Sequence, residues 1–310
     1  MTSAALLWGS GLLAFGPMAS LLFLVAYQKA QLVIVLTTSA FAYLLSALMA
    51  SAFWWIFDVI GLDLGVLVLS PGVVLSFLFR CCFVALYHKV EKVIETSIAQ
   101  HEASSRSNGD AAQRPQNNAN NANDNDDNAA WTDSARLRLE LNDWSCGLAA
   151  GTGFGGMHAL LLYGSLLASE AGNLGTLYQE SCPSMPSLLL SAFNAFFFSI
   201  LDVLWMLLTF FGMRRRLAGY RNDAEQHGWG AMLGNDRTAG TNALIIAFVS
   251  HGVATYCTTL NGSTFGCAFS LPLLGLVTLG TFGIFWVGAS RIYLPLSQRR
   301  RVMGDGGHEG

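Results

Sequence analysis

The chain alternates between long apolar runs and shorter polar connections. A helix needs about 20 apolar residues to cross a hydrocarbon core of ~30 Å, and runs of that length occur seven times, over 3–26, 32–57, 64–87, 144–168, 188–212, 240–260 and 268–290. The first run has no basic leading segment and is far longer than a signal-peptide core, so we expect it to be retained. The pattern predicts an all-α membrane protein, a seven-transmembrane helix bundle.

Composition agrees with a membrane location. Hydrophobic residues make up 53% of the chain and charged residues only 12%, against roughly 25% charged residues in soluble domains. Sixteen of the 17 Lys and Arg residues fall in the first, third and fifth connections and the C-terminal tail, and the remaining one is Arg80, inside the third run. Because cytoplasmic loops carry the excess of basic residues, we expect an exoplasmic N-terminus and a cytosolic C-terminus.

One long polar interruption divides the predicted helices into two groups. Val90, Val93 and Ile94 keep helical spacing beyond the third apolar run, which predicts a cytosolic extension of that helix. The tract NNANNANDNDDN that follows cannot bury enough apolar surface to offset its ordering entropy. The predicted organisation is transmembrane helices 1–3 with the extension over 1–100, a disordered Asn-rich cytosolic loop over 101–142, transmembrane helices 4–7 over 143–298, and a cytosolic tail over 299–310.

The third predicted helix has two unusual features. Pro71-Gly72 lies within its apolar run, where the missing N–H and the flexible glycine predict a kink. Arg80 lies about two turns from the cytosolic end, and we expect its long side chain to reach the interface by snorkelling.

A stripe of glycines characterises the fourth predicted helix. Gly147, Gly151 and Gly155 advance by four residues, so successive members shift by only about 40° around a helix of 3.6 residues per turn. His158 and Ser165 fall on the same face. In lipid, helices associate through close backbone approach and cross-helix hydrogen bonds, so the stripe predicts a helix-packing face that another helix enters.

Two ionisable residues lie near mid-depth of neighbouring predicted helices, Asp202 in the fifth and His251 in the sixth. Ionisable groups inside a membrane usually face the bundle interior and have partners, so we expect these two to form an intramembrane polar pair. Two interpretations stay open: a contact that only positions the helices, or a proton relay or acid–base pair.

Motifs of intramembrane proteolysis do not occur within the predicted spans. We find there no G-x-S-x-G serine, no H-E-x-x-H zinc motif and no paired aspartates in Tyr-Asp and Gly-x-Gly-Asp contexts. An aspartyl mechanism needs two carboxylates that share a proton, and Asp202 is the only aspartate well inside a span. The sequence predicts neither a catalytic residue nor a metal site.

The cysteines differ in predicted location. Cys182 and Cys267 lie in the two predicted exoplasmic loops next to the last three helices, on the side of the membrane where disulfides persist, and a bridge between them is possible. The sequon Asn261-Gly-Ser lies on the same side but so close to a helix end that we expect it to stay unmodified.

Several segments together resemble the Aph (anterior-pharynx-defective) family, the scaffold subunit of γ-secretase. They are LLAFGP (12–17), GLAAGTGFGG from residue 147, GTLYQESCPSMP (175–186), SHGVATYCTTLN (250–261) and GCAFSLPLL (266–274). The resemblance covers all seven predicted helices and excludes the Asn-rich insertion.

The resemblance implies a noncatalytic subunit without a cofactor. Its implied partners are presenilin, nicastrin, the presenilin enhancer subunit and the lipid bilayer, with no nucleic acid. The implied complex cleaves single-span proteins such as Notch-type receptors, in the endoplasmic reticulum, Golgi, endosomes and plasma membrane. The glycine stripe matches the family's assembly motif, and its groove would receive helices of the partner subunits. His251 matches the family histidine of the sixth helix.

The sequence departs from the family at the fifth helix, where a second histidine is usual and Asp202 stands here. We therefore expect a mixed Asp–His contact. Two other functions remain as alternatives: a seven-helix receptor, although the Asp-Arg-Tyr and Asn-Pro-x-x-Tyr motifs of rhodopsin-like receptors are absent, and a transporter or enzyme that uses Asp202 and His251.

Overall fold

The computed structural model describes residues 4–28, 30–61, 70–111, 143–170, 177–179, 181–217, 236–264 and 266–288. The chain divides into two compact units, one of residues 1–83 with 143–310 and one of residues 84–142. The first unit holds every site discussed below. The second consists, in its described part, of the continuation of one helix to residue 111.

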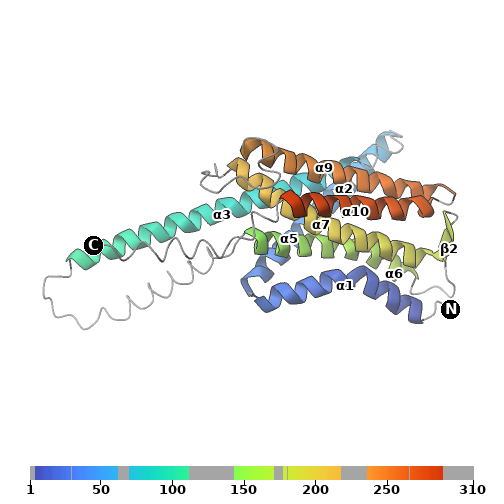
Figure 1. Ribbon diagram of the computed structural model, residues 1–310, viewed down its shortest axis with the longest axis horizontal. Helices are drawn as coiled ribbons and strands as arrows, with labels where there is room; N and C mark the ends of the chain where they lie inside the picture. Colours follow the sequence, from blue (N-terminus) through green and yellow to red (C-terminus); the bar gives the residue numbers. More distant parts are fainter. Residues whose placement is uncertain are drawn as a thin grey trace. The chain divides into compact units, whose positions relative to one another are not determined.

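The described residues are nearly all helical (Figure 1). Six helices are long and apolar enough to cross a membrane. They are α1 (Ala4–Gln28), α2 (Ala30–Ile60), α3 (Ser70–Ala111), α7 (Ser187–Leu217), α9 (Asp236–Thr259) and α10 (Cys267–Gly288). Each of the six covers most or all of one predicted apolar run, which agrees with a multi-pass membrane protein.

The remaining predicted span, over 144–168, is a helical run interrupted by a wider turn. It consists of α5 (Asp143–Ala159), the π-helical turn η2 (Leu160–Gly164) and α6 (Ser165–Glu170). A π turn adds one residue to the helical repeat, and this one carries the buried Tyr163, whose hydroxyl lies 2.7 Å from Ser10 Oγ of α1. The spacing of apolar residues does not predict this turn.

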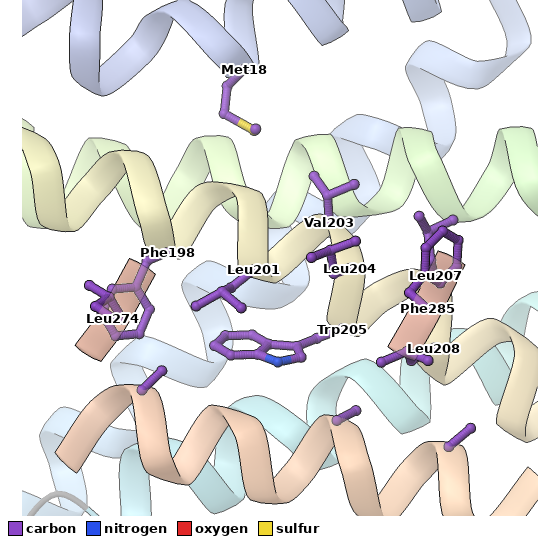
Figure 2. Close-up of a cluster of buried hydrophobic side chains, with 13 residues drawn as sticks. Met18, Phe198, Leu201, Val203, Leu204, Trp205, Leu207, Leu208, Leu274 and Phe285 are labelled. Carbon is purple, nitrogen blue, oxygen red and sulfur yellow. The ribbon is translucent and has the colours of Figure 1, made fainter. Parts of the chain in front are cut away.

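Helix α7 forms the centre of the first unit. It packs against α1, α5, α9 and α10. In its most apolar stretch of 18 residues, 72% of the residues are buried, compared with 17–33% in the corresponding stretches of the other five spanning helices. Figure 2 shows its side chains, with Trp205 among them, filling the space between neighbouring helices. Since lipid supplies the outer environment, large apolar side chains also cover the outside, including Phe41, Trp55 and Leu276.

The kink expected at Pro71 stays a prediction, because the described part of α3 begins at Ser70 and the residues directly before it lie outside the described part of the chain. The helix continues past the third apolar run, as predicted, but it extends to Ala111. Residues 101–111, which were predicted to belong to the disordered loop, are therefore helical. The cytosolic location of this extension stays a prediction. The Asn-rich tract and the C-terminal tail lie outside the described residues.

A short antiparallel hairpin is the one non-helical element among the described residues. It joins β1 (Tyr178–Gln179) to β2 (Cys182–Pro186). Pro183 and Pro186 in the segment CPSMP favour extended backbone for the residues before them, and the helical pattern did not predict this hairpin. The structure places Cys182 of β2 in a disulfide with Cys267, the first residue of α10.

The disulfide closes a loop with a sequence separation of 85 residues. Because such a cross-link restricts the unfolded chain, we expect Cys182→Ser to lower the free energy of unfolding by about 2–4 kcal/mol. Thermal unfolding in detergent under non-reducing conditions measures this. Cys82→Ser, which alters an exposed free cysteine, is the matched control and should leave the transition unchanged. Equal transitions for Cys182→Ser and the unmodified chain would contradict the expectation.

Candidate functional site: a glycine face and a buried polar cluster

The glycine stripe of α5 faces α7 of the same chain. A Cβ atom added to Gly147, Gly151 or Gly155 would lie, respectively, 2.9 Å from Leu207 Cδ2, 2.7 Å from Val203 Cα and 2.8 Å from Ser199 O. Cβ atoms in proteins essentially never approach other heavy atoms within 3.0 Å. At Gly151 and Gly155 these atoms belong to the backbone of α7, so the two backbones meet at a distance that only glycine permits, as expected of membrane helices that associate through small residues. At Gly147 the nearest atom is the end of the Leu207 side chain, which can shift.

The prediction that this groove receives a partner helix is corrected by this packing. Helix α7 occupies the groove, so the stripe is a helix-packing face inside the chain. A further glycine, Gly153, has the same role toward α2, because its added Cβ would overlap Leu36 O and Ser39 Oγ. The four-residue spacing did not reveal Gly153, although two glycine faces on one helix are a signal of two close neighbours.

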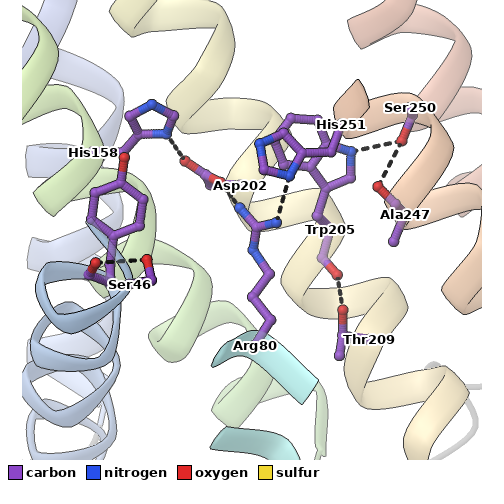
Figure 3. Close-up of polar contacts among 10 residues, drawn as sticks. Ser46, Arg80, His158, Asp202, Trp205, Thr209, Ala247, Ser250 and His251 are labelled. Atoms are coloured by element: carbon purple, nitrogen blue, oxygen red, sulfur yellow. Dashed lines mark hydrogen bonds and ion pairs between the residues drawn. The ribbon is translucent and has the colours of Figure 1, made fainter. Parts of the chain in front are cut away.

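Four polar side chains from four helices meet beside the glycine face and are here called the polar cluster: Arg80 of α3, His158 of α5, Asp202 of α7 and His251 of α9 (Figure 3). The Arg80 guanidinium donates to Asp202 Oδ1. His158 Nδ1 lies 2.7 Å from Asp202 Oδ2, and Arg80 Nη1 lies 3.2 Å from His251 Nδ1. Both oxygens of the carboxylate are thus engaged.

The expectation that Arg80 snorkels is wrong. Its side chain is 1% exposed and that of Asp202 is fully buried. The guanidinium carbon lies 4.6 Å from the ring centroid of Phe154 and 5.0 Å from that of Trp205, distances at which aromatic faces attract a cation. An opposite charge on α7 and two aromatic faces hold the guanidinium in the bundle.

Aromatic rings fix both histidines. Tyr43 stacks on His158 with 4.9 Å between ring centroids, and Trp205 stacks on His251 at 4.3 Å. The Trp205 indole nitrogen donates to Ser250 Oγ at 2.7 Å. This hydrogen bond orients the indole on which His251 stacks. The rings therefore restrict each imidazole to one plane.

The predicted direct contact between Asp202 and His251 is replaced by contacts of both residues with Arg80. Both belong to the polar cluster, but Arg80 contacts each of them and lies between them (Figure 3). The histidine in contact with the carboxylate is His158. Sequence reasoning assigned Arg80 to the interface and His158 to the glycine face. The signal that could have found the cluster is charge balance, because a buried carboxylate needs a cation at the same depth.

The polar cluster links α3, α5, α7 and α9 through charge-assisted hydrogen bonds. It contains one carboxylate, whose two oxygens both serve contacts between helices. Such an arrangement can hold helices in register and orient two imidazole rings.

Residues 5–291 match the Aph-1 protein family. The chain belongs to the Aph-1 family. The match spans all the helices of the first unit, and with them the glycine face, the polar cluster and the disulfide of this Aph-1 protein. A search of curated proteins found no match. Membership in the Aph-1 family supports a role as a component of γ-secretase, in which this family is generally a noncatalytic subunit.

Proposed function

We propose that this chain is the noncatalytic scaffold subunit of a γ-secretase intramembrane aspartyl protease. In this role it stabilises presenilin and nicastrin, with the presenilin enhancer subunit as a further partner, and supports cleavage of single-span proteins such as Notch-type receptors. The observation that carries the proposal is the Aph-1 family match over residues 5–291. The same proposal includes an exoplasmic N-terminus, a cytosolic C-terminus and residence in the endoplasmic reticulum, Golgi, endosomes and plasma membrane.

The chemistry of the polar cluster supports a role without catalysis. An aspartyl protease needs two carboxylates that share one proton, and the cluster contains only Asp202. That carboxylate accepts from Arg80 and contacts His158, and its side chain is fully buried. Asp202 is therefore suited to hold helices together. Both of its carboxylate oxygens have partners, so neither is free to activate water.

The glycine face supports assembly indirectly in this account. Since α7 fills the groove of α5, the glycines determine how closely the two central helices pack. We infer that the partner subunits contact outer surfaces, whose positions depend on that central packing. A larger side chain at Gly151 would then weaken the complex by displacing α7.

Affinity purification of the full chain in a mild detergent, followed by mass spectrometry, tests the proposal. The expected result is co-elution of presenilin and nicastrin homologues in stoichiometric amounts. Recovery of the chain without them would contradict it, and a seven-helix receptor would behave in that way. In a second arm the purified chain is reconstituted in liposomes, where a scaffold shows no proton-coupled uptake. Uptake that His251→Ala abolishes would favour the transporter alternative.

A further inference from the structure

Arg80 contacts two different groups, the carboxylate of Asp202 and the imidazole of His251. Its guanidinium donates to the Asp202 carboxylate, and its Nη1 lies 3.2 Å from His251 Nδ1. A guanidinium has five N–H donors, no acceptor, and does not lose its proton in proteins. At both contacts Arg80 must therefore be the donor.

This constraint determines which nitrogen of His251 carries hydrogen. Because Nδ1 accepts from Arg80, it has no hydrogen, and a neutral imidazole then carries its hydrogen on Nε2. A second hydrogen on Nδ1 would direct two N–H groups at each other across 3.2 Å and place two positive charges side by side. The ring cannot turn away from this contact easily, because it is stacked on Trp205.

His158 has the opposite arrangement. Its Nδ1 lies 2.7 Å from Asp202 Oδ2, and an ionised carboxylate can only accept, so this nitrogen carries hydrogen. The two histidines of the polar cluster thus differ at Nδ1, which carries hydrogen in His158 and none in His251, and the difference follows from whether Nδ1 meets Asp202 or Arg80.

We propose that Arg80 is the positioning residue of the polar cluster: it holds His251 as the neutral tautomer with hydrogen on Nε2, while it donates to the Asp202 carboxylate that His158 contacts. This inference goes beyond the proposed function and does not depend on it, since it concerns the chain alone. It also gives a physical reason why an aspartate can lie fully buried in α7. The carboxylate is balanced by a cation on α3.

Nitrogen-15 NMR of the histidine side chains tests the proposal in the full chain, reconstituted in detergent micelles. The signals of His251 and His158 are assigned by their loss in His251→Gln and His158→Gln. In the unmodified chain we expect His251 to show an unprotonated Nδ1 and a protonated Nε2, and His158 to show a protonated Nδ1. A His251 with hydrogen on Nδ1, or on both nitrogens, overturns the proposal without any change at Arg80.

Variants of Arg80 show whether its charge positions His251 or whether its side chain only fills space. Arg80→Lys keeps one charged donor and should retain the unprotonated Nδ1, whereas Arg80→Met should remove it and give a mixture of tautomers. Ser76→Ala is the matched control one turn away on α3, where the buried hydroxyl has no hydrogen-bond partner among the described residues. Spectra of His251 that are identical in Arg80→Met and the unmodified chain, or altered equally by Ser76→Ala, would overturn the proposal.

Discussion

Replacement of Arg80 with methionine is expected to lower the free energy of unfolding by about 3–5 kcal/mol, because it leaves a buried carboxylate without its counter-charge. Asp202 is fully buried, and its other contact is a single histidine nitrogen. Methionine keeps much of the length of the arginine side chain, so the loss measures charge and hydrogen bonds more than volume. Unfolding of the purified chain in mixed micelles, followed by tryptophan fluorescence, gives this quantity.

A second substitution should restore most of that stability. Apolar residues of similar volume often replace a buried ion pair at little or no cost, so Arg80→Met combined with Asp202→Leu should recover more than half of the loss. Ser76→Ala serves as control and should stay within about 0.5 kcal/mol, as substitutions that break no contact usually do. If the single variant unfolds like the unmodified chain, or if the double variant is worse than either single one, the ion pair does not stabilise the bundle as described.

Replacement of Gly151 with leucine is expected to separate the two central helices. An added Cβ alone would lie 2.7 Å from Val203 Cα and 3.2 Å from Val203 O, and backbone atoms cannot give way as a flexible side chain does. Overpacking of a core usually costs about 1–3 kcal/mol, and a backbone clash in the middle of a helix pair should reach or exceed the top of that range. We expect reduced folded yield and loss of co-purified partner subunits.

Gly156 of the same helix provides the control for this experiment. A Cβ there would meet only Met18 Cβ, at 4.0 Å, so Gly156→Leu should fold and retain partners. The comparison keeps composition and helix constant and changes only which face carries the side chain. Equal recovery of partners with Gly151→Leu and Gly156→Leu, whether high or low, would contradict the assignment of the glycine face.

The positions of the helices follow from the sequence, because a membrane span must form all of its backbone hydrogen bonds internally and expose apolar side chains to lipid. The helices therefore lie close to the predicted apolar runs. The run 188–212, for example, lies within α7, which covers Ser187–Leu217. The π-helical turn and the hairpin do not follow, since neither changes the apolar content of the chain. The residues involved contact distant parts of the chain: Tyr163 of the π-helical turn contacts Ser10 of α1, and Cys182 of the hairpin is bonded to Cys267.

The partners of the polar residues were the harder part of the site to predict. Spacing places Asp202 and His251 at one depth, but depth does not tell which side chain enters between them. The distance of Arg80 from the cytosolic end predicts an interfacial guanidinium, but distance along the helix does not give the direction of the side chain, which points into the bundle. For Gly151, spacing identified the face correctly and assigned it to the wrong occupant, because one chain can supply both helices of a close pair.

We infer that Asp202 holds helices together and does not take part in peptide-bond cleavage. Cleavage of a single-span substrate is measured with complexes that contain the Arg80→Met, Asp202→Leu chain, and activity is normalised to the amount of assembled complex. We expect unchanged cleavage per complex, since the carboxylate is absent while the packing is kept. Complexes that assemble in normal amounts and fail to cleave would show that Asp202 has a part in the reaction.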